Sequence, residues 1–275
     1  MDILHTIFLA LLQGMTEFLP VSSSAHLILP KDVLGWPDQG LAFDVAVHVG
    51  TLSAVMIYFR QDIITLTRDW VLSLPLINTM ASSETPVNAN NTRLAWGVIL
   101  ATVPAAIFGL LGGDFIETYL RSSLVIACTT IIFGLALLWA DKTSQCAKNL
   151  THLTLKAALI IGIAQALALI PGTSRSGITI TAALFLGFTR EDSARFSFLL
   201  SIPIILLSGG YMSLKLIGNN NIDWLALGVG MLVSGISAYL CIHYFLIAIS
   251  KIGMLPFVIY RLVLGCLLLF MVFGL

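Results

Sequence analysis

Six apolar segments, each long enough for a helix to cross a bilayer, constrain this chain more than any other feature. They cover residues 41–59, 94–113, 122–140, 196–217, 224–249 and 253–274. A helix needs about 20 apolar residues to cross a hydrocarbon core about 30 Å thick. Only 10% of the residues are charged, against about 25% in soluble domains. The sequence therefore predicts an all-α integral membrane protein with six transmembrane helices.

Two further apolar stretches, 3–29 and 157–187, are broken in the middle by proline and polar residues. The run "FLPVSSSAH" interrupts the first and "IPGTSRSG" interrupts the second. Each half is too short to cross, and non-helical backbone at membrane depth is tolerated only inside protein or beside a wet cavity. We therefore expect two re-entrant helical hairpins.

The order of hairpin, span, span, span occurs twice along the chain. It predicts a single membrane domain over 1–275, built from repeats at about 1–142 and 150–275. The alignment pairs Pro20 with Pro171, Phe43 with Phe196 and Gly97 with Gly228. Because each repeat has an odd number of crossings, the second must be inverted relative to the first. The two hairpins should then enter from opposite leaflets.

Lys and Arg are distributed unevenly between the two sides of the predicted spans. One side carries nine, namely Arg60, Arg68, Arg93, Lys142, Lys148, Lys156, Arg190, Arg195 and Lys251. The other side carries three, namely Lys31, Arg121 and Lys215. Because cytoplasmic loops hold an excess of Lys and Arg, the loop 60–93 should be cytoplasmic and both termini should lie outside.

Charge and cysteine patterns argue against several other classes of protein. The 14 basic and 14 acidic residues cancel, and no basic cluster exists to bind nucleic acid. The four cysteines are scattered without a CxxC pair, so neither a zinc site nor a disulfide framework is indicated. Asp2 stands where a signal peptide would carry positive charge, so we expect no cleaved targeting segment.

The first interruption carries Glu17, an acid at predicted membrane depth. Ionisable groups there cost about 3 kcal/mol and usually mark function. Gln13 lies four residues earlier, on the same helix face, and His26 follows the serine run Ser22–Ser24. A neutral hydrogen-bonded Glu17 and a structural His26 are the alternatives.

The second interruption, "PGTSRSGIT", has the composition of an anion-binding loop. Arg175 lies between Ser174 and Ser176, and Thr179 follows one turn later. Hydroxyls, the free N–H groups of a helix start and a planar guanidinium all suit phosphate oxygens. The alternatives are serines that only cap a helix and a static salt bridge between Arg175 and Glu17.

Three more ionisable residues lie in or beside predicted spans. Asp44 and His48 are four residues apart at the start of a span, and are either part of the site or face the outer water. Arg261 lies about eight residues into the last span. We expect it to be a structural counter-charge to Glu17 or Asp44.

If the hairpins meet tip to tip, an acid, a histidine and hydroxyls face an arginine. This combination suits phosphoryl transfer, in which arginine stabilises phosphoryl charge and a His or Ser attacks or moves a proton. One carboxylate plus phosphate oxygens is a sparse ligand set of the kind that Mg²⁺ favours.

The segments "QGMTEFLPVSSSAH" and "PGTSRSGIT" resemble the two signatures of the bacterial undecaprenyl-diphosphate phosphatases of the bacitracin-resistance type. These signatures are Glu-or-Gln, three residues, Glu, and Pro-Gly-x-Ser-Arg-Ser-x-x-Thr. "RFSFLLSIP" and "LPFVIYR" also look familial, so the resemblance covers essentially the whole chain. It implies a plasma-membrane enzyme that hydrolyses undecaprenyl diphosphate to the monophosphate at a site open to the periplasm.

The resemblance also implies roles for individual residues. Catalytic roles fall on Glu17, Ser23, His26 and Arg175, and diphosphate binding falls on Ser22, Ser174, Arg175, Ser176 and Thr179. A divalent cation, Mg²⁺ or alternatively Ca²⁺, is implied on Glu17 and Gln13. Many relatives have Glu at the position of Gln13, so a mechanism with two carboxylates on one metal is in doubt here. We expect His26 to be the nucleophile or the acid/base, assisted by Ser23.

A transporter is the competing interpretation, because inverted repeats with broken helices also describe secondary carriers, including a lipid-phosphate flippase. An enzyme is favoured, since a carrier needs no nucleophile beside its arginine. The implied partners are the undecaprenyl diphosphate lipid and the bilayer, without nucleic acid. A homodimer is left open.

Overall fold

The computed structural model describes residues 2–36, 40–75, 86–216 and 223–274, and in this part of the chain the regular elements are all helices. Six are long and apolar enough to cross a membrane, which confirms the predicted spans. They are α3 (Gly40–Tyr58), α6 (Ala89–Tyr119), α7 (Ser123–Thr143), α10 (Arg190–Lys215), α11 (Trp224–Ile252) and α12 (Leu255–Phe273).

Two of these helices begin five or six residues earlier than their apolar segments. Helix α6 starts five residues before 94 and α10 starts six residues before 196. In both cases a capping side chain sets the start: Asn88 accepts from the N–H of Asn90, and Thr189 accepts from the N–H of Asp192. Each helix therefore extends beyond the N-terminal end of its apolar segment, as far as the residue that caps it.

The two interrupted stretches each form a pair of short helices joined by a non-helical turn. The first pair is α1 (Ile3–Thr16) and α2 (Ser23–Leu34); the second is α8 (Leu155–Ala166), extended by the 3₁₀ turn η2 (Leu167–Leu169), and α9 (Arg175–Phe185). Each break contains the proline that the sequence placed there. The insertion of these pairs into the bilayer from opposite leaflets stays a prediction.

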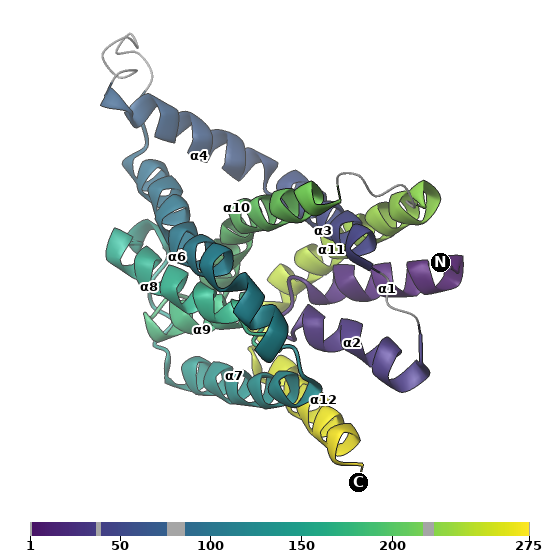
Figure 1. Cartoon of the computed structure of the whole chain (residues 1–275). Coiled ribbons are helices and arrows are strands. Elements are labelled where there is room, and N and C mark those ends of the chain that lie inside the picture. Colours follow the sequence, from purple (N-terminus) through teal and green to yellow (C-terminus); the bar gives the residue numbers. More distant parts are fainter. Residues whose placement is uncertain (1, 37–39, 76–85, 217–222, 275) are drawn as a thin grey trace.

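The two helix pairs meet near the centre of the molecule (Figure 1). Helix α1 packs on α11 and α8 packs on α6, and these are matching positions of the two predicted repeats. Helices α7 and α12, the last of each repeat, pack on each other. The pairing is what an internal repeat requires, while the repeat boundaries and the inverted topology stay predictions.

Helix α4 (Arg60–Ser73) packs on the start of α6 beyond the spans. Asp69 is almost fully buried between them and accepts a hydrogen bond from Asn91 at 2.7 Å and two from Arg68. Burial alone would raise the pKa of the Asp69 carboxyl, but these hydrogen bonds outweigh it and hold that pKa below its ordinary value.

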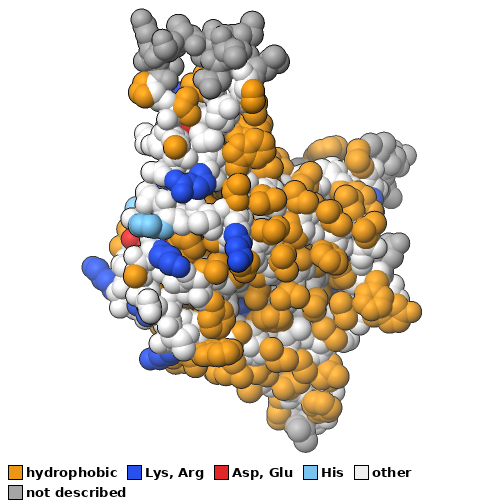
Figure 2. All heavy atoms as spheres, turned by 90° about the vertical axis from the view of Figure 1, so that its left-hand side faces the viewer, with side chains coloured by type: hydrophobic (Ala, Val, Ile, Leu, Met, Phe, Trp, Pro, Cys, Tyr) orange, Lys and Arg blue, Asp and Glu red, His pale blue; other side chains and the backbone are white. Residues whose placement is uncertain are grey.

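Large apolar side chains cover much of the outer surface. Figure 2 shows a broad hydrophobic face with Lys and Arg gathered mainly toward one side of it. Residues such as Leu110, Leu111 and Leu232 are more than 60% exposed. Exposed apolar area on this scale indicates contact with lipid.

Candidate active site

Glu17 and Arg175 form an ion pair that joins the two helix pairs. Glu17 lies at the end of α1, Arg175 is the first residue of α9, and Nη2 of Arg175 donates to Oε1 of Glu17 at 3.1 Å. The two side chains are only 8% and 13% exposed. The structure therefore brings together the acid and the arginine that the sequence placed 158 residues apart.

The second oxygen of Glu17 is surrounded by donors. Oε2 accepts from Nε2 of Gln13 at 2.9 Å and from Oγ of Ser23 at 3.1 Å. Gln13 is fully buried. The carboxylate is thus held between its own helix, the first turn of α2 and the other helix pair. Hydrogen bonds from this many donors fix the orientation of the carboxylate.

His48, one of the two weaker candidates, also reaches this group. Its Nε2 lies 3.2 Å from Nε2 of Gln13 and 3.9 Å from Oε2 of Glu17. Its Nδ1 lies 2.7 Å from the carbonyl oxygen of Asp44. Because a carbonyl only accepts, Nδ1 carries a proton, and in the tautomer protonated at Nδ1 alone Nε2 accepts from the Gln13 amide. The structure therefore places the backbone carbonyl of Asp44 against the ring of His48.

His26 occupies a neighbouring position with different partners. It is 3% exposed; Nδ1 lies 2.7 Å from the carbonyl oxygen of Ser22, and Nε2 lies 2.6 Å from the hydroxyl of Tyr260. By the same reasoning Nε2 of the neutral ring accepts from Tyr260. Its hydrogen bonds within the described residues therefore go to Ser22 and Tyr260 rather than to Glu17 or Arg175, and its role as nucleophile or acid/base stays a prediction.

The hydroxyls expected to bind diphosphate are engaged within the protein. Ser174 caps α9 by accepting from the N–H of Gly177, and Ser176 donates to the carbonyl oxygen of Leu19 at 2.8 Å. Thr179 lies 2.7 Å from the hydroxyl of Ser197. These three residues brace the turn that presents Arg175. Their binding of diphosphate stays a prediction.

The serine run at the start of α2 makes the reciprocal contact, from the first turn to the second. Ser24 accepts from the N–H of Gly172 at 3.1 Å, and its hydroxyl lies 3.1 Å from that of Ser22. The two turns therefore hold each other through Ser24 in one and Ser176 in the other. This mutual contact fixes the start of α2, where Ser23 meets Glu17.

Arg261 does not serve as the expected counter-charge. It is fully buried, and its donors reach backbone carbonyl oxygens rather than Glu17 or Asp44. The expectation failed because a guanidinium with five donors can be satisfied by carbonyls as well as by a carboxylate.

Gln13 and Glu17 supply oxygen atoms of the kind that suits the implied cation. Oε1 of Gln13 is buried without a hydrogen-bond partner in the structure, so an oxygen beside Glu17 is available. The described residues contain no group of three or more His, Cys, Asp or Glu side chains arranged for a metal. The pair therefore fits Mg²⁺ only if water and phosphate oxygens supply most of the ligands, which is how Mg²⁺ is commonly bound.

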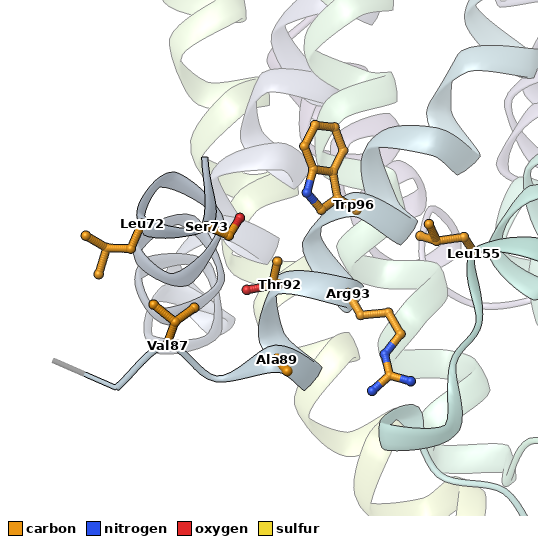
Figure 3. A pocket seen from close by; sticks show the side chains of 8 residues that line it. All are labelled: Leu72, Ser73, Val87, Ala89, Thr92, Arg93, Trp96 and Leu155. Carbon is orange, nitrogen blue, oxygen red and sulfur yellow. The ribbon is translucent and has the colours of Figure 1, made fainter. Parts of the chain in front are cut away.

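A separate cavity of about 580 Å³ lies between α4, α6 and the start of α8 (Figure 3). Its lining is Leu72, Ser73, Val87, Ala89, Thr92, Arg93, Trp96 and Leu155. It offers one cation and two hydroxyls, without an acid or a histidine. This lining lacks an acid or a histidine that could activate a hydroxyl for hydrolysis, so the buried group around Glu17 is the candidate site.

Residues 6–267 match the family model described as bacitracin resistance protein BacA. The chain belongs to this family. Proteins named undecaprenyl-diphosphatase from Saccharophagus degradans, Teredinibacter turnerae and Aliivibrio salmonicida are 66%, 61% and 60% identical to it. The alignments cover 96%, 98% and 98% of this chain and the same shares of the relatives. The predicted resemblance is confirmed.

In this BacA-family chain the sequence analysis missed two residues that contact the site. Ser197 contacts both Thr179 and Arg175, whose Nη1 lies 3.4 Å from the Ser197 carbonyl oxygen. A signal existed, because Ser193, Ser197 and Ser201 recur every four residues and mark one polar face of α10. Tyr260 had no such signal, since a single tyrosine in an apolar span is ordinary.

Proposed function

We propose that this chain hydrolyses undecaprenyl diphosphate to undecaprenyl phosphate and inorganic phosphate. This reaction recycles the lipid carrier for cell-wall synthesis and gives resistance to bacitracin. Membership of the BacA family and the names of the close relatives support the reaction. The observation that carries the site assignment is the contact of Glu17 with both Arg175 and Ser23.

In the proposed mechanism Arg175 turns from Glu17 to the phosphate oxygens of the substrate. Its planar fork and the start of α9 stabilise the charge on the transferring phosphoryl group. Phosphate oxygens would also replace some of the internal hydrogen bonds of Ser174, Ser176 and Thr179. Ser22 precedes α2 as Ser174 precedes α9, and the free backbone N–H groups at the start of α2 would be further donors to the diphosphate.

Ser23 is the better placed nucleophile of the two candidates, because its hydroxyl already donates to Glu17. Its Oγ attacks the terminal phosphorus, its proton passes to Glu17, and the P–O bond to undecaprenyl phosphate breaks. Water then hydrolyses the phosphoserine and releases inorganic phosphate. His26, neutral and with a basic Nε2, moves protons between these steps.

A divalent cation, Mg²⁺ in preference to Ca²⁺, belongs to the proposal. The Glu17 carboxylate and Oε1 of Gln13 would hold it together with phosphate oxygens and water, once the Gln13 amide turns its Nε2 away from Glu17. When bound it would neutralise phosphate charge during transfer. Gln13 is neutral, so Glu17 supplies the only protein carboxylate.

The proposal places the protein in the bacterial plasma membrane with the site open to the periplasm. Its support is the nine-to-three distribution of Lys and Arg, which puts the N-terminus outside. Single cysteines at Thr118 and Thr151, in a background without the four native cysteines, should react from opposite sides of intact cells. Reaction from the same side would contradict the topology. Assembly as a homodimer stays a prediction.

Phosphate release by the purified protein in detergent tests the function. A prenyl diphosphate should be hydrolysed without a second compartment, and EDTA should stop the reaction. A flippase would release no phosphate but would move lipid phosphate across reconstituted vesicles. That outcome would favour the transporter instead.

A further inference from the structure

Arg261 is a fully buried cation in α12, and within the described residues its hydrogen bonds all go to backbone carbonyl oxygens. Nε donates to the carbonyl oxygen of Thr130 at 3.0 Å, and Nη1 donates to that of Pro20 at 3.3 Å. Nη2 donates to the carbonyl oxygens of Gly172 and Thr173, each at 3.0 Å. One side chain therefore binds α7 and the turns of both helix pairs.

Three of these four carbonyls belong to residues in the turns where the two helix pairs are broken. Pro20 lies just before α2, and Gly172 and Thr173 lie just before α9. Where a helix stops inside a membrane protein, its carbonyls lose their intrahelical partners and need other donors. Arg261 provides them for both breaks at once, and in doing so it ties the two turns to a common point.

The side chain of Arg261 is tightly enclosed by its neighbours. A Cβ added to Gly134 would lie 3.3 Å from Cβ of Arg261, and one added to Gly177 would lie 2.8 Å from its Nη1. Nη1 is the atom that reaches Pro20 in the first turn. The absence of a side chain at Gly177 therefore leaves room for the link between the two turns.

We propose that Arg261 is a positioning residue that sets the separation of the two turns and so brings Glu17 and Arg175 into contact. None of the four hydrogen bonds described above goes to either of these residues. It acts on them through Pro20, three residues after Glu17, and Thr173, two residues before Arg175. This inference rests on the catalytic roles proposed above for Glu17 and Arg175.

The first test compares Arg261→Lys with Thr130→Val. Lysine keeps the charge but has one nitrogen, which cannot serve four carbonyls. We expect kcat for prenyl diphosphate hydrolysis to fall about 100-fold, while KM changes by less than about fivefold. Thr130 donates its hydroxyl to the same Gly172 carbonyl oxygen at 3.2 Å but touches only the second turn. Thr130→Val should keep kcat within about threefold of wild type, because the link between the turns remains.

Thermal stability separates positioning from simple support of the fold. If Arg261 only stabilises the fold, Arg261→Lys lowers the yield and the unfolding temperature, while kcat per folded molecule stays at the wild-type value. That result would overturn the inference.

The second test does not depend on the folding of Arg261→Lys alone. Gly177→Ala replaces a glycine inside α9 with a better helix former but pushes against Nη1, so kcat should fall about tenfold without a loss of thermal stability. In the Arg261→Lys background the same change should cost less than about twofold, because Nη1 is absent. A Cβ at residue 177 would also lie 3.1 Å from Ser174, and this contact is present in both backgrounds. Equal losses in both backgrounds would contradict the proposal.

A Glu17→Gln enzyme distinguishes failure of this inference from failure of the proposed function. Wild-type turnover by Glu17→Gln would remove the proposed site itself. Wild-type kcat for Arg261→Lys together with an inactive Glu17→Gln would leave the site standing and remove only the positioning role of Arg261.

Discussion

Ser22 and Ser174 share the same unusual backbone conformation. Their φ and ψ angles are 72° and 95° for Ser22, and 68° and 112° for Ser174, and each residue directly precedes a short helix. Positive φ is strained for a residue with a Cβ and costs about 1–3 kcal/mol, so it persists only where the surroundings enforce it. Two equivalent strained serines, 152 residues apart, indicate that the two turns share the same backbone geometry.

Arg175→Lys tests whether the guanidinium fork is needed. Lysine keeps the charge but cannot make the two-pronged contact with phosphate oxygens, so transition-state stabilisation of about 3 kcal/mol should be lost. We expect kcat/KM for undecaprenyl diphosphate to fall at least about 100-fold with little change in stability. Arg195→Lys, at an arginine paired with Asp62 away from the site, is the matched control. Near-normal activity of Arg175→Lys would make Arg175 a static partner of Glu17.

Gln13→Glu tests the cation site. A second carboxylate beside Glu17 adds negative charge to an oxygen-only site, so the variant should be active and need less Mg²⁺. Equilibrium titration of Mg²⁺ against protein thermal stability, in parallel with phosphate release, measures this change. A folded Gln13→Glu enzyme that needs more Mg²⁺ than wild type would contradict a site on these two residues.

Tyr260→Phe tests the partner of His26. The phenylalanine keeps the ring contact but removes the hydroxyl that lies 2.6 Å from Nε2. If His26 moves protons, losing this orienting bond should lower kcat about tenfold and alter the pH–rate profile while KM changes little. Tyr244→Phe, on an exposed face of α11, should behave as wild type. Identical pH–rate profiles for Tyr260→Phe and wild type would show that the bond has no catalytic role.

Asp69→Asn tests the anchor of α4. The pKa of Asp69 is lowered in the folded protein, so the stabilisation is complete above the unfolded pKa of about 4 and is lost as pH falls through the folded value. Asp69→Asn should therefore unfold at a lower temperature than wild type at pH 7, and this difference should shrink below about pH 4. A difference that stays constant down to pH 3 would exclude the charge of Asp69 as its cause.

The main features of the fold could be predicted because they follow from local sequence. Apolar length located the six spans, and Pro20 and Pro171 located the breaks. Contacts between the two turns could not be predicted, since Ser24 with Gly172 and Ser176 with Leu19 depend on how the turns meet in space. The start of α6 was missed because a cap, rather than hydropathy, sets it.

Within the site, Glu17, Arg175 and Ser23 were identified because charged and nucleophilic groups are conspicuous among apolar residues. The contact of His48 with Gln13 could not be predicted, since nothing in the sequence shows that α3 packs beside α1 at this level of the bundle. Arg261 was correctly placed inside the protein but given the wrong partner, because backbone carbonyls freed by a break in another segment carry no sequence signal.

The most direct test of the account measures phosphate release from undecaprenyl diphosphate by purified wild type, Glu17→Gln and Glu191→Gln in detergent with Mg²⁺. Glu191 is an exposed acid at the start of α10, so Glu191→Gln controls for the loss of one carboxylate. The account predicts rapid release by wild type and Glu191→Gln, and no measurable release by Glu17→Gln at any Mg²⁺ concentration. Turnover by Glu17→Gln at the wild-type rate would contradict it.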